Sequence, residues 1–174
     1  MDTQQRFESL YSAHAGAVLA YALRRTDRAS AEDALADVFL VAWRRLQDVP
    51  ADERVWLLGV ARRVLANQRR GRARQLALRE RLTSQAQAWT LGAEVRDNRL
   101  LEALARLRAA DREALLLVAW DGLSHDEAAR VLGIRARTFG VRIHRARRRL
   151  ERALALGEGG TAGCDERPTT MEVT

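Results

Sequence analysis

The stretch that most constrains this chain runs from Leu123 to Leu150 and predicts two short helices joined at a glycine. Ser124 and Glu127 have the spacing of a capping box, in which each side chain accepts a hydrogen bond from the other residue's amide. Gly133 stands where the first helix should end, because glycine adopts a left-handed backbone at the least cost. The stretch therefore predicts a helix, a tight turn and a second helix.

The second of these helices has one apolar and one basic face. The apolar residues are spaced by four, three and four positions, which places them on a single stripe of the helix: Phe139, Ile143, Ala146 and Leu150. The opposite face carries Arg137, Thr138, Arg142, Arg145, Arg148 and Arg149. In a helix-turn-helix the second helix enters the major groove of DNA, and the small Ala129 would let the two helices approach. The pattern favours such a DNA-binding motif over an ordinary helical hairpin with a solvated basic face.

Composition agrees with a polyanionic partner. The formal net charge is +7 and the sequence pI about 11.1. Every basic residue except the histidines is arginine, which suits bidentate contacts to phosphate and guanine. A GC-rich coding sequence explains that bias equally well. A hydrophobic content of 47% is enough for a packed core.

Other classes of site find little support. Cys164 is the one cysteine, and His14, His125 and His144 lack the spacing of metal ligands, so we expect neither a metal nor a cofactor. No apolar run approaches the ~20 residues needed to cross a bilayer. We therefore expect no membrane insertion and a cytoplasmic location.

Two helices are expected in the first 46 residues. The first spans about Arg6 to Arg25, with Tyr11 and Tyr21 on its apolar stripe. The second should begin at Ser30, with Asp33 completing its cap. Its apolar stripe would comprise Ala34, Leu35, Val38, Phe39, Ala42, Trp43 and Leu46.

The second helix has an acidic amino-terminal half, formed by Glu32, Asp33 and Asp37, and a basic end that includes Arg44. The helix dipole alone explains this distribution. A protein-docking surface is the alternative, and periodicity does not decide between the two.

A third helix is expected from about Val55 to Gln68, after a polar loop at 47–54. Arg62 and Arg63 project outward, and a basic run follows at Arg69, Arg70, Arg72 and Arg74. Two basic surfaces far apart in the sequence suggest one extended nucleic-acid contact. The alternative here is a solvated helix end.

These elements predict an all-α protein with two small helical domains joined by a flexible linker. The expected division is a first domain at 1–74, a linker at 75–94, a helix-turn-helix domain at 95–156 and a disordered tail at 157–174.

Three stretches, in this order, resemble an extracytoplasmic-function (ECF) sigma factor, the minimal promoter-specificity subunit of bacterial RNA polymerase. They lie within Ala31 to Trp43, Val55 to Arg62 and Leu123 to Leu150. In the family, the first belongs to the polymerase-binding part of region 2. The second serves the minus-ten promoter element, and the third is region 4, which reads the minus-thirty-five element. The resemblance covers nearly the whole chain apart from the linker and the tail.

The resemblance implies a factor that binds core polymerase and promoter DNA, directs promoter opening and starts transcription, without being an enzyme. Contacts to the clamp helices of the polymerase beta-prime subunit would come from Glu32, Asp33, Asp37 and Arg44. The minus-ten element would meet Asp48, Arg54, Arg62, Arg63, Asn67, Arg69 and Arg70. The minus-thirty-five element would meet Arg135, Arg137, Thr138, Arg142 and Arg145. The linker would thread the polymerase channel, so the beta subunit is also an implied partner, and inhibitory anti-sigma factors are common in the family.

The chain departs from the family pattern at several of these positions. Arg135 stands where a serine usually opens the recognition helix, and Gly140 and Val141 replace a basic residue and a serine. A glycine inside a helix costs about 1 kcal/mol relative to alanine. Arg63 and Asn67 stand where asparagine and aspartate are common. These changes bear on DNA readout rather than on the fold.

Two rival functions are less well supported. A stand-alone helix-turn-helix regulator would bind promoter duplex without polymerase, and its first domain would sense or dimerise. A recombinase-like enzyme would need a nucleophile, but Tyr11 and Tyr21 are both expected on a core stripe.

Overall fold

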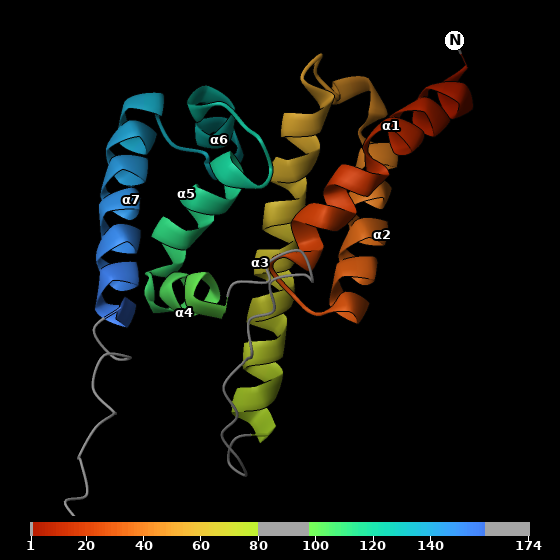
Figure 1. Ribbon diagram of the computed structural model, residues 1–174. Helices are drawn as coiled ribbons and strands as arrows, with labels where there is room; N and C mark the ends of the chain where they lie inside the picture. The colour runs from red at the N-terminus through yellow and green to blue at the C-terminus, as the bar shows by residue number, and fades with distance from the viewer. Residues whose placement is uncertain (1, 80–97, 159–174) are drawn as a thin grey trace, which may run out of the picture.

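The computed structural model describes residues 2–79 and 98–158, and these residues are entirely helical apart from turns and loops (Figure 1). The α-helices are α1 (Thr3–Leu23), α2 (Arg28–Arg44), α3 (Glu53–Arg79), α4 (Asn98–Arg106), α5 (Ala109–Ala119), α6 (His125–Leu132) and α7 (Ala136–Glu158). One 3-10 turn, η1, spans Leu46–Asp48. The all-α prediction is confirmed. Most of the expected linker and tail lies outside the described residues, although 75–79 continue α3 and 157–158 end α7.

Helices α1, α2 and α3 pack pairwise into one bundle (Figure 1). Its centre is filled by residues with no more than 4% exposure, among them Leu10, Val18, Val38, Phe39, Leu57 and Leu65. This bundle holds the acidic face of α2 and the basic face of α3 in a fixed relation.

Helix α2 begins two residues earlier than the sequence suggested, because Asp27 and not Ser30 is its N-cap. The Asp27 carboxylate accepts from the Ser30 amide at 3.0 Å and from the Ser30 hydroxyl at 2.7 and 2.6 Å. These bonds hold the pKa of Asp27 well below its ordinary value. The prediction that Ser30 and Asp33 form the cap is therefore wrong: Asp27 has the extended backbone of an N-cap and accepts from the Ser30 amide in the first turn.

Two aromatic residues expected in the core are half exposed. Tyr11 is 44% and Trp43 47% exposed. Each lies at the edge of a stripe and packs one face on the bundle, Tyr11 against Phe39 with ring centroids 4.6 Å apart and Trp43 against Phe7 at 5.0 Å. Tyr21, in contrast, is fully buried, as predicted.

Helix α3 continues eleven residues past the expected end near Gln68, to Arg79. No proline interrupts this stretch. Arg72 connects the extension to the beginning of α2. Its guanidinium pairs with Asp27 at 3.2 Å and donates to the Ser30 hydroxyl. The basic run at 69–74 is therefore helical rather than loop.

The second body, α4 to α7, contains the predicted helix-turn-helix. The Glu127 amide donates to the Ser124 hydroxyl at 3.3 Å, and the Ser124 amide donates to the Glu127 carboxylate at 2.8 Å. The Ser124 bonds lower the pKa of Glu127. Gly133 has φ +67°, and the amide of Ile134 donates to the Ala129 carbonyl at 3.0 Å. These bonds form a Schellman C-cap, so the capping box and the turn are confirmed.

Helix α7 buries the predicted apolar stripe. Phe139 and Ala146 are fully buried, Ile143 is 2% exposed and Leu150 is partly buried. The stripe packs on α4, α5 and α6. This packing orients the arginine face of α7 away from the core.

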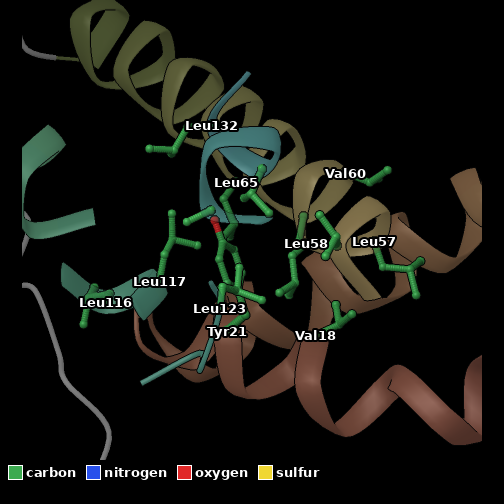
Figure 2. Packing of buried hydrophobic residues seen from close by; sticks show 14 of the residues in the cluster. Val18, Tyr21, Leu57, Leu58, Val60, Leu65, Leu116, Leu117, Leu123 and Leu132 are labelled. Atoms are coloured by element: carbon green, nitrogen blue, oxygen red, sulfur yellow. The ribbon is translucent and has the colours of Figure 1, made fainter. Parts of the chain in front are cut away.

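The two bodies also pack on each other, which no local pattern in the sequence indicated. Helix α6 lies against α3 (Figure 1), although the two are separated in sequence by more than forty residues. Figure 2 shows side chains from both bodies meeting, with Tyr21 and Leu65 beside Leu117, Leu123 and Leu132. The described residues share one contiguous apolar core.

Candidate functional site

The arginine face of α7 lines a concave surface of about 530 Å³, here called the recognition groove. The groove is lined by Arg108, Asp111, Arg135, Arg137, Thr138, Val141, Arg142, Arg145 and Arg149. All five residues that the sequence analysis assigned to the minus-thirty-five element are among them. The structure thus brings the whole predicted set to one surface.

The recognition groove is strongly basic, since six of its lining residues are arginines and one is acidic. That acid, Asp111, is buried and forms an ion pair with Arg149. Arg135 lies at the amino terminus of α7, where its carbonyl accepts from the Phe139 amide at 3.0 Å. Its positive charge opposes the helix dipole at that end, so an anion bound there would be favourable.

Four residues of the recognition groove were not assigned to the site from the sequence. Arg108 and Asp111 come from the junction of α4 and α5, so the periodicity of α7 carries no sign of them. Arg149 follows Arg145 by one turn, a spacing that marked it as part of the same face. Val141 is 49% exposed on the groove.

Gly140 is not required by packing. A Cβ added at this residue would meet no atom within 4 Å. The glycine therefore removes a side chain from the beginning of the recognition helix without allowing any close approach in the structure.

The basic face of α3 is the second candidate surface. Arg62, Arg63, Asn67 and Arg70 are exposed on α3, and Arg70 donates to Asn67. Asp48 is exposed in η1 and pairs with Arg45 at 3.3 Å. Arg62 also lines a cleft of about 280 Å³, together with Arg69 and, from α7, Arg142.

Two further residues expected at the minus-ten element donate to backbone carbonyls that are distant in sequence. Arg54 donates to the backbone carbonyl of Asp121, on the second body. Arg69 donates to the carbonyl of Arg25 at 3.2 Å. Their guanidinium groups are therefore engaged in the arrangement that the structure describes.

The third candidate surface is the outer face of α2. Glu32, Asp33, Asp37 and Arg44 are all exposed. Glu32 pairs with Arg28 at 2.9 Å, and Asp37 accepts a hydrogen bond from Gln68 at 3.4 Å. Because the three acids are exposed to solvent, they are accessible to a partner along one helix.

Leu40 and Trp43 extend this acidic face with apolar surface, since each is 47% exposed. Leu40 follows Asp33 by two turns and Asp37 by one, so the three share one side of α2. Leu40 was not among the predicted site residues, and Trp43 was predicted to lie in the core. The helical spacing from Asp33 was the signal that could have found Leu40.

No group of three histidine, cysteine, aspartate or glutamate side chains gathers as a metal site within the described ranges 2–79 and 98–158. In the same part of the chain, no helix combines the length and hydropathy needed to span a bilayer.

Comparison with known proteins identifies both bodies. The Sigma-70 region 2 model matches residues 10–75, and the Sigma-70 region 4 model matches residues 97–150. The ECF RNA polymerase sigma factor SigL of Mycobacterium tuberculosis is 35% identical over 158 residues, covering 84% of this chain and 87% of SigL. The sigma factor NccH of Alcaligenes xylosoxydans xylosoxydans is 31% identical over 161 residues, covering 84% of this chain and 86% of NccH.

A solved structure is similar over almost the whole chain. CnrH in complex with the cytosolic domain of CnrY has 28% identity and a TM-score of 0.59, covering 91% of each chain. A stand-alone regulator would need only the region 4 motif, whereas this chain carries region 2 as well. The chain therefore belongs to the ECF sigma factors, the non-catalytic RNA polymerase subunits that direct promoter recognition and the initiation of transcription.

Proposed function

We propose that three surfaces of this sigma factor divide the work of initiation. The exposed face of α2 binds the clamp helices of the polymerase beta-prime subunit, through Glu32, Asp33, Asp37 and Arg44. The loop at 47–54 and the basic face of α3 bind the minus-ten element as its strands open. The recognition groove binds the minus-thirty-five duplex.

The observation that carries this proposal is the convergence of Arg135, Arg137, Thr138, Arg142 and Arg145 on one groove. A recognition helix needs its base-contacting side chains on one face, near its amino terminus. Arginine there can donate two hydrogen bonds to guanine, and neighbouring arginines can neutralise phosphates. The groove supplies both kinds of contact.

The proposed polymerase site has support in the mixed chemistry of α2. The exposed acids can pair with basic residues of a partner and increase the rate of association. Leu40 and Trp43 provide exposed apolar surface that would be buried from water on binding. The proposed minus-ten surface has support in the exposed arginines of α3, which suit a phosphate backbone. The loop at 47–54, which includes Asp48, would hold an unstacked base, and its contacts with that base must offset an unstacking cost of a few kcal/mol.

Replacing Arg142 with alanine tests the recognition groove. If Arg142 reads a base, the change should weaken binding to the minus-thirty-five element by about 1–3 kcal/mol and relax specificity at one position. The measurement is affinity of the polymerase holoenzyme for promoters that vary at each position of that element. Salt concentration is held fixed, because phosphate contacts are salt-dependent.

Arg147→Ala is the matched control, because Arg147 is exposed on α7 but does not line the groove. It removes the same charge and should change specificity little. An Arg142→Ala effect equal on all sequences would make Arg142 a phosphate contact instead. Equal behaviour of the two variants would contradict the groove assignment.

We further propose an anti-sigma factor as a protein partner, and a cytoplasmic location, where polymerase and chromosome meet. The support is the similarity to CnrH, which was solved with the cytosolic domain of CnrY. A partner of this kind should compete with core polymerase for the chain. Simultaneous binding of both, measured with labelled chain and purified proteins, would contradict the competition.

A further inference from the structure

Val141 is an apolar residue in the middle of a basic surface. Its side chain is 49% exposed on α7 and lines the recognition groove. Among the side chains that the structure describes in α4 to α7, it is the only large apolar one that is exposed. The groove around it consists mainly of arginines, which suit phosphate and guanine. Val141 can take part in neither kind of contact.

Helical spacing places Val141 at the centre of the groove side of α7. Arg137 and Thr138 precede it by four and three residues, and Arg145 follows it by four. Side chains at these spacings are neighbours on one helix face. All four line the recognition groove. A duplex that Arg137 and Arg145 contact together therefore also meets Val141.

The residue before Val141 leaves it uncovered. Gly140 has no side chain, and a Cβ built there would meet no atom within 4 Å. No side chain at position 140 can therefore cover Val141 or hold α7 away from the bases of a duplex.

The stability of α7 does not explain a valine at this position. A β-branched side chain loses rotamer freedom in a helix, so valine is a poorer helix former than arginine or alanine. Burial offsets this loss in a core, as it does for Ile143, but Val141 stays half exposed. Single exposed apolar side chains are common on protein surfaces, and what distinguishes Val141 is its place among the arginines of the groove.

The major groove of DNA offers one apolar group that suits such a side chain. Each base pair presents hydrogen-bond donors and acceptors there, and thymine adds its C5-methyl group. Valine has no side-chain donor or acceptor, so it gains nothing from the polar groups. Contact with the methyl group removes apolar surface of both partners from water.

We propose that Val141 contacts the C5-methyl group of a thymine in the minus-thirty-five element and thereby sets the base preference at one position of that element. The inference rests on the proposed function, because it requires the recognition groove to bind this element. The arginines around Val141 hold the duplex through phosphate and guanine. Val141 selects a T·A pair at its own position, since no other ordinary base carries a methyl group in the major groove.

The test removes the methyl group and keeps the base pair. Deoxyuridine pairs with adenine and retains the O4 acceptor of thymine, but it lacks the C5-methyl group. Each thymine of the minus-thirty-five element, on either strand, is replaced in turn in a promoter found by mapping the transcript starts of the holoenzyme. Affinity of the holoenzyme is measured at fixed salt. At one thymine the replacement should weaken binding about fourfold, the effect of one buried methyl group.

Val141→Ala is the matched variant. It withdraws the two methyl groups that extend into the groove, and its exposed position should leave α7 folded. Holoenzyme that contains this variant should no longer distinguish thymine from deoxyuridine at that position. A double-mutant cycle over protein and base cancels any effect of deoxyuridine on the duplex itself. Val141→Ile keeps a branched apolar side chain and should retain the preference for thymine.

A second arm puts the methyl group back on another base. Cytosine in place of the critical thymine should weaken binding by the unmodified chain, and 5-methylcytosine at the same position should recover part of the loss. Holoenzyme with Val141→Ala should bind the cytosine and 5-methylcytosine promoters equally.

Three results would overturn the proposal: deoxyuridine that weakens binding at no thymine, deoxyuridine that weakens the Val141→Ala holoenzyme as much as the unmodified one, or an element that contains no A·T pair. Failure of the proposed function would look different. The whole minus-thirty-five element could then be randomised without loss of holoenzyme affinity, and the contact at Val141 would fall with it.

Discussion

Reversal of charge at both Asp33 and Asp37, to arginine, is expected to abolish binding of core polymerase while helix content stays unchanged. Both carboxylates are exposed on one side of α2. Like charges brought together at an interface cost several kcal/mol, and the partner proposed for this face is a surface that attracts acids. Affinity for core polymerase, with circular dichroism on the same samples, measures the effect.

The matched control reverses Glu102 and Glu151, which are exposed acids of the second body, and changes the net charge by the same amount. That variant should retain polymerase binding through α2. If the Asp33/Asp37 variant bound as tightly as the control, the acidic half of α2 would be explained by the helix dipole alone, and the docking assignment would fail.

The second large effect is expected from Phe139→Ala. Phe139 is fully buried beneath the recognition groove, and its ring packs against His125 with centroids 5.6 Å apart. Truncation of a buried phenylalanine removes apolar contacts and leaves a cavity, which costs about 3–5 kcal/mol. The loss should appear in denaturant unfolding and should also remove recognition of the minus-thirty-five element, because α7 loses its anchor.

Val141→Ala is the control for this change, since Val141 lies two residues away on α7 but is 49% exposed. Exposed substitutions of this kind usually change stability by less than about 0.5 kcal/mol. If Phe139→Ala changed the free energy of unfolding by less than about 0.5 kcal/mol, the stripe of α7 would not be the core of region 4.

The helix-turn-helix was predictable because its signals are local. The capping box of Ser124 and Glu127, the left-handed Gly133 and the stripe of α7 each lie within a few residues, and all of them reappear in the structure. The arginine face followed from the same helical period. Local chemistry also explains the error at Ser30, because two good capping residues, Asp27 and Ser30, stand within one turn and periodicity cannot rank them.

The remaining features depend on partners distant in sequence. Arg25 meets Asp121 across 96 residues, and no periodic pattern marks either as a partner of the other. Arg108 joins the recognition groove only because α5 and α7 pack together. Tyr11 and Trp43 fit an apolar stripe by spacing, but their place at its edge is decided by the packing of α1 on α2. Sequence therefore predicted the helices and the face of α7 on which the five arginine and threonine side chains lie, whereas it did not predict the contact between the two bodies.

Joined to core polymerase, this chain selects where transcription starts. The most direct test adds the purified protein to core polymerase and genomic DNA and maps the 5′ ends of the transcripts. We predict new start sites that share one sequence near minus ten and another near minus thirty-five, and that vanish with the Asp33/Asp37 reversal. The same start sites with and without the protein would mean that the chain does not direct initiation.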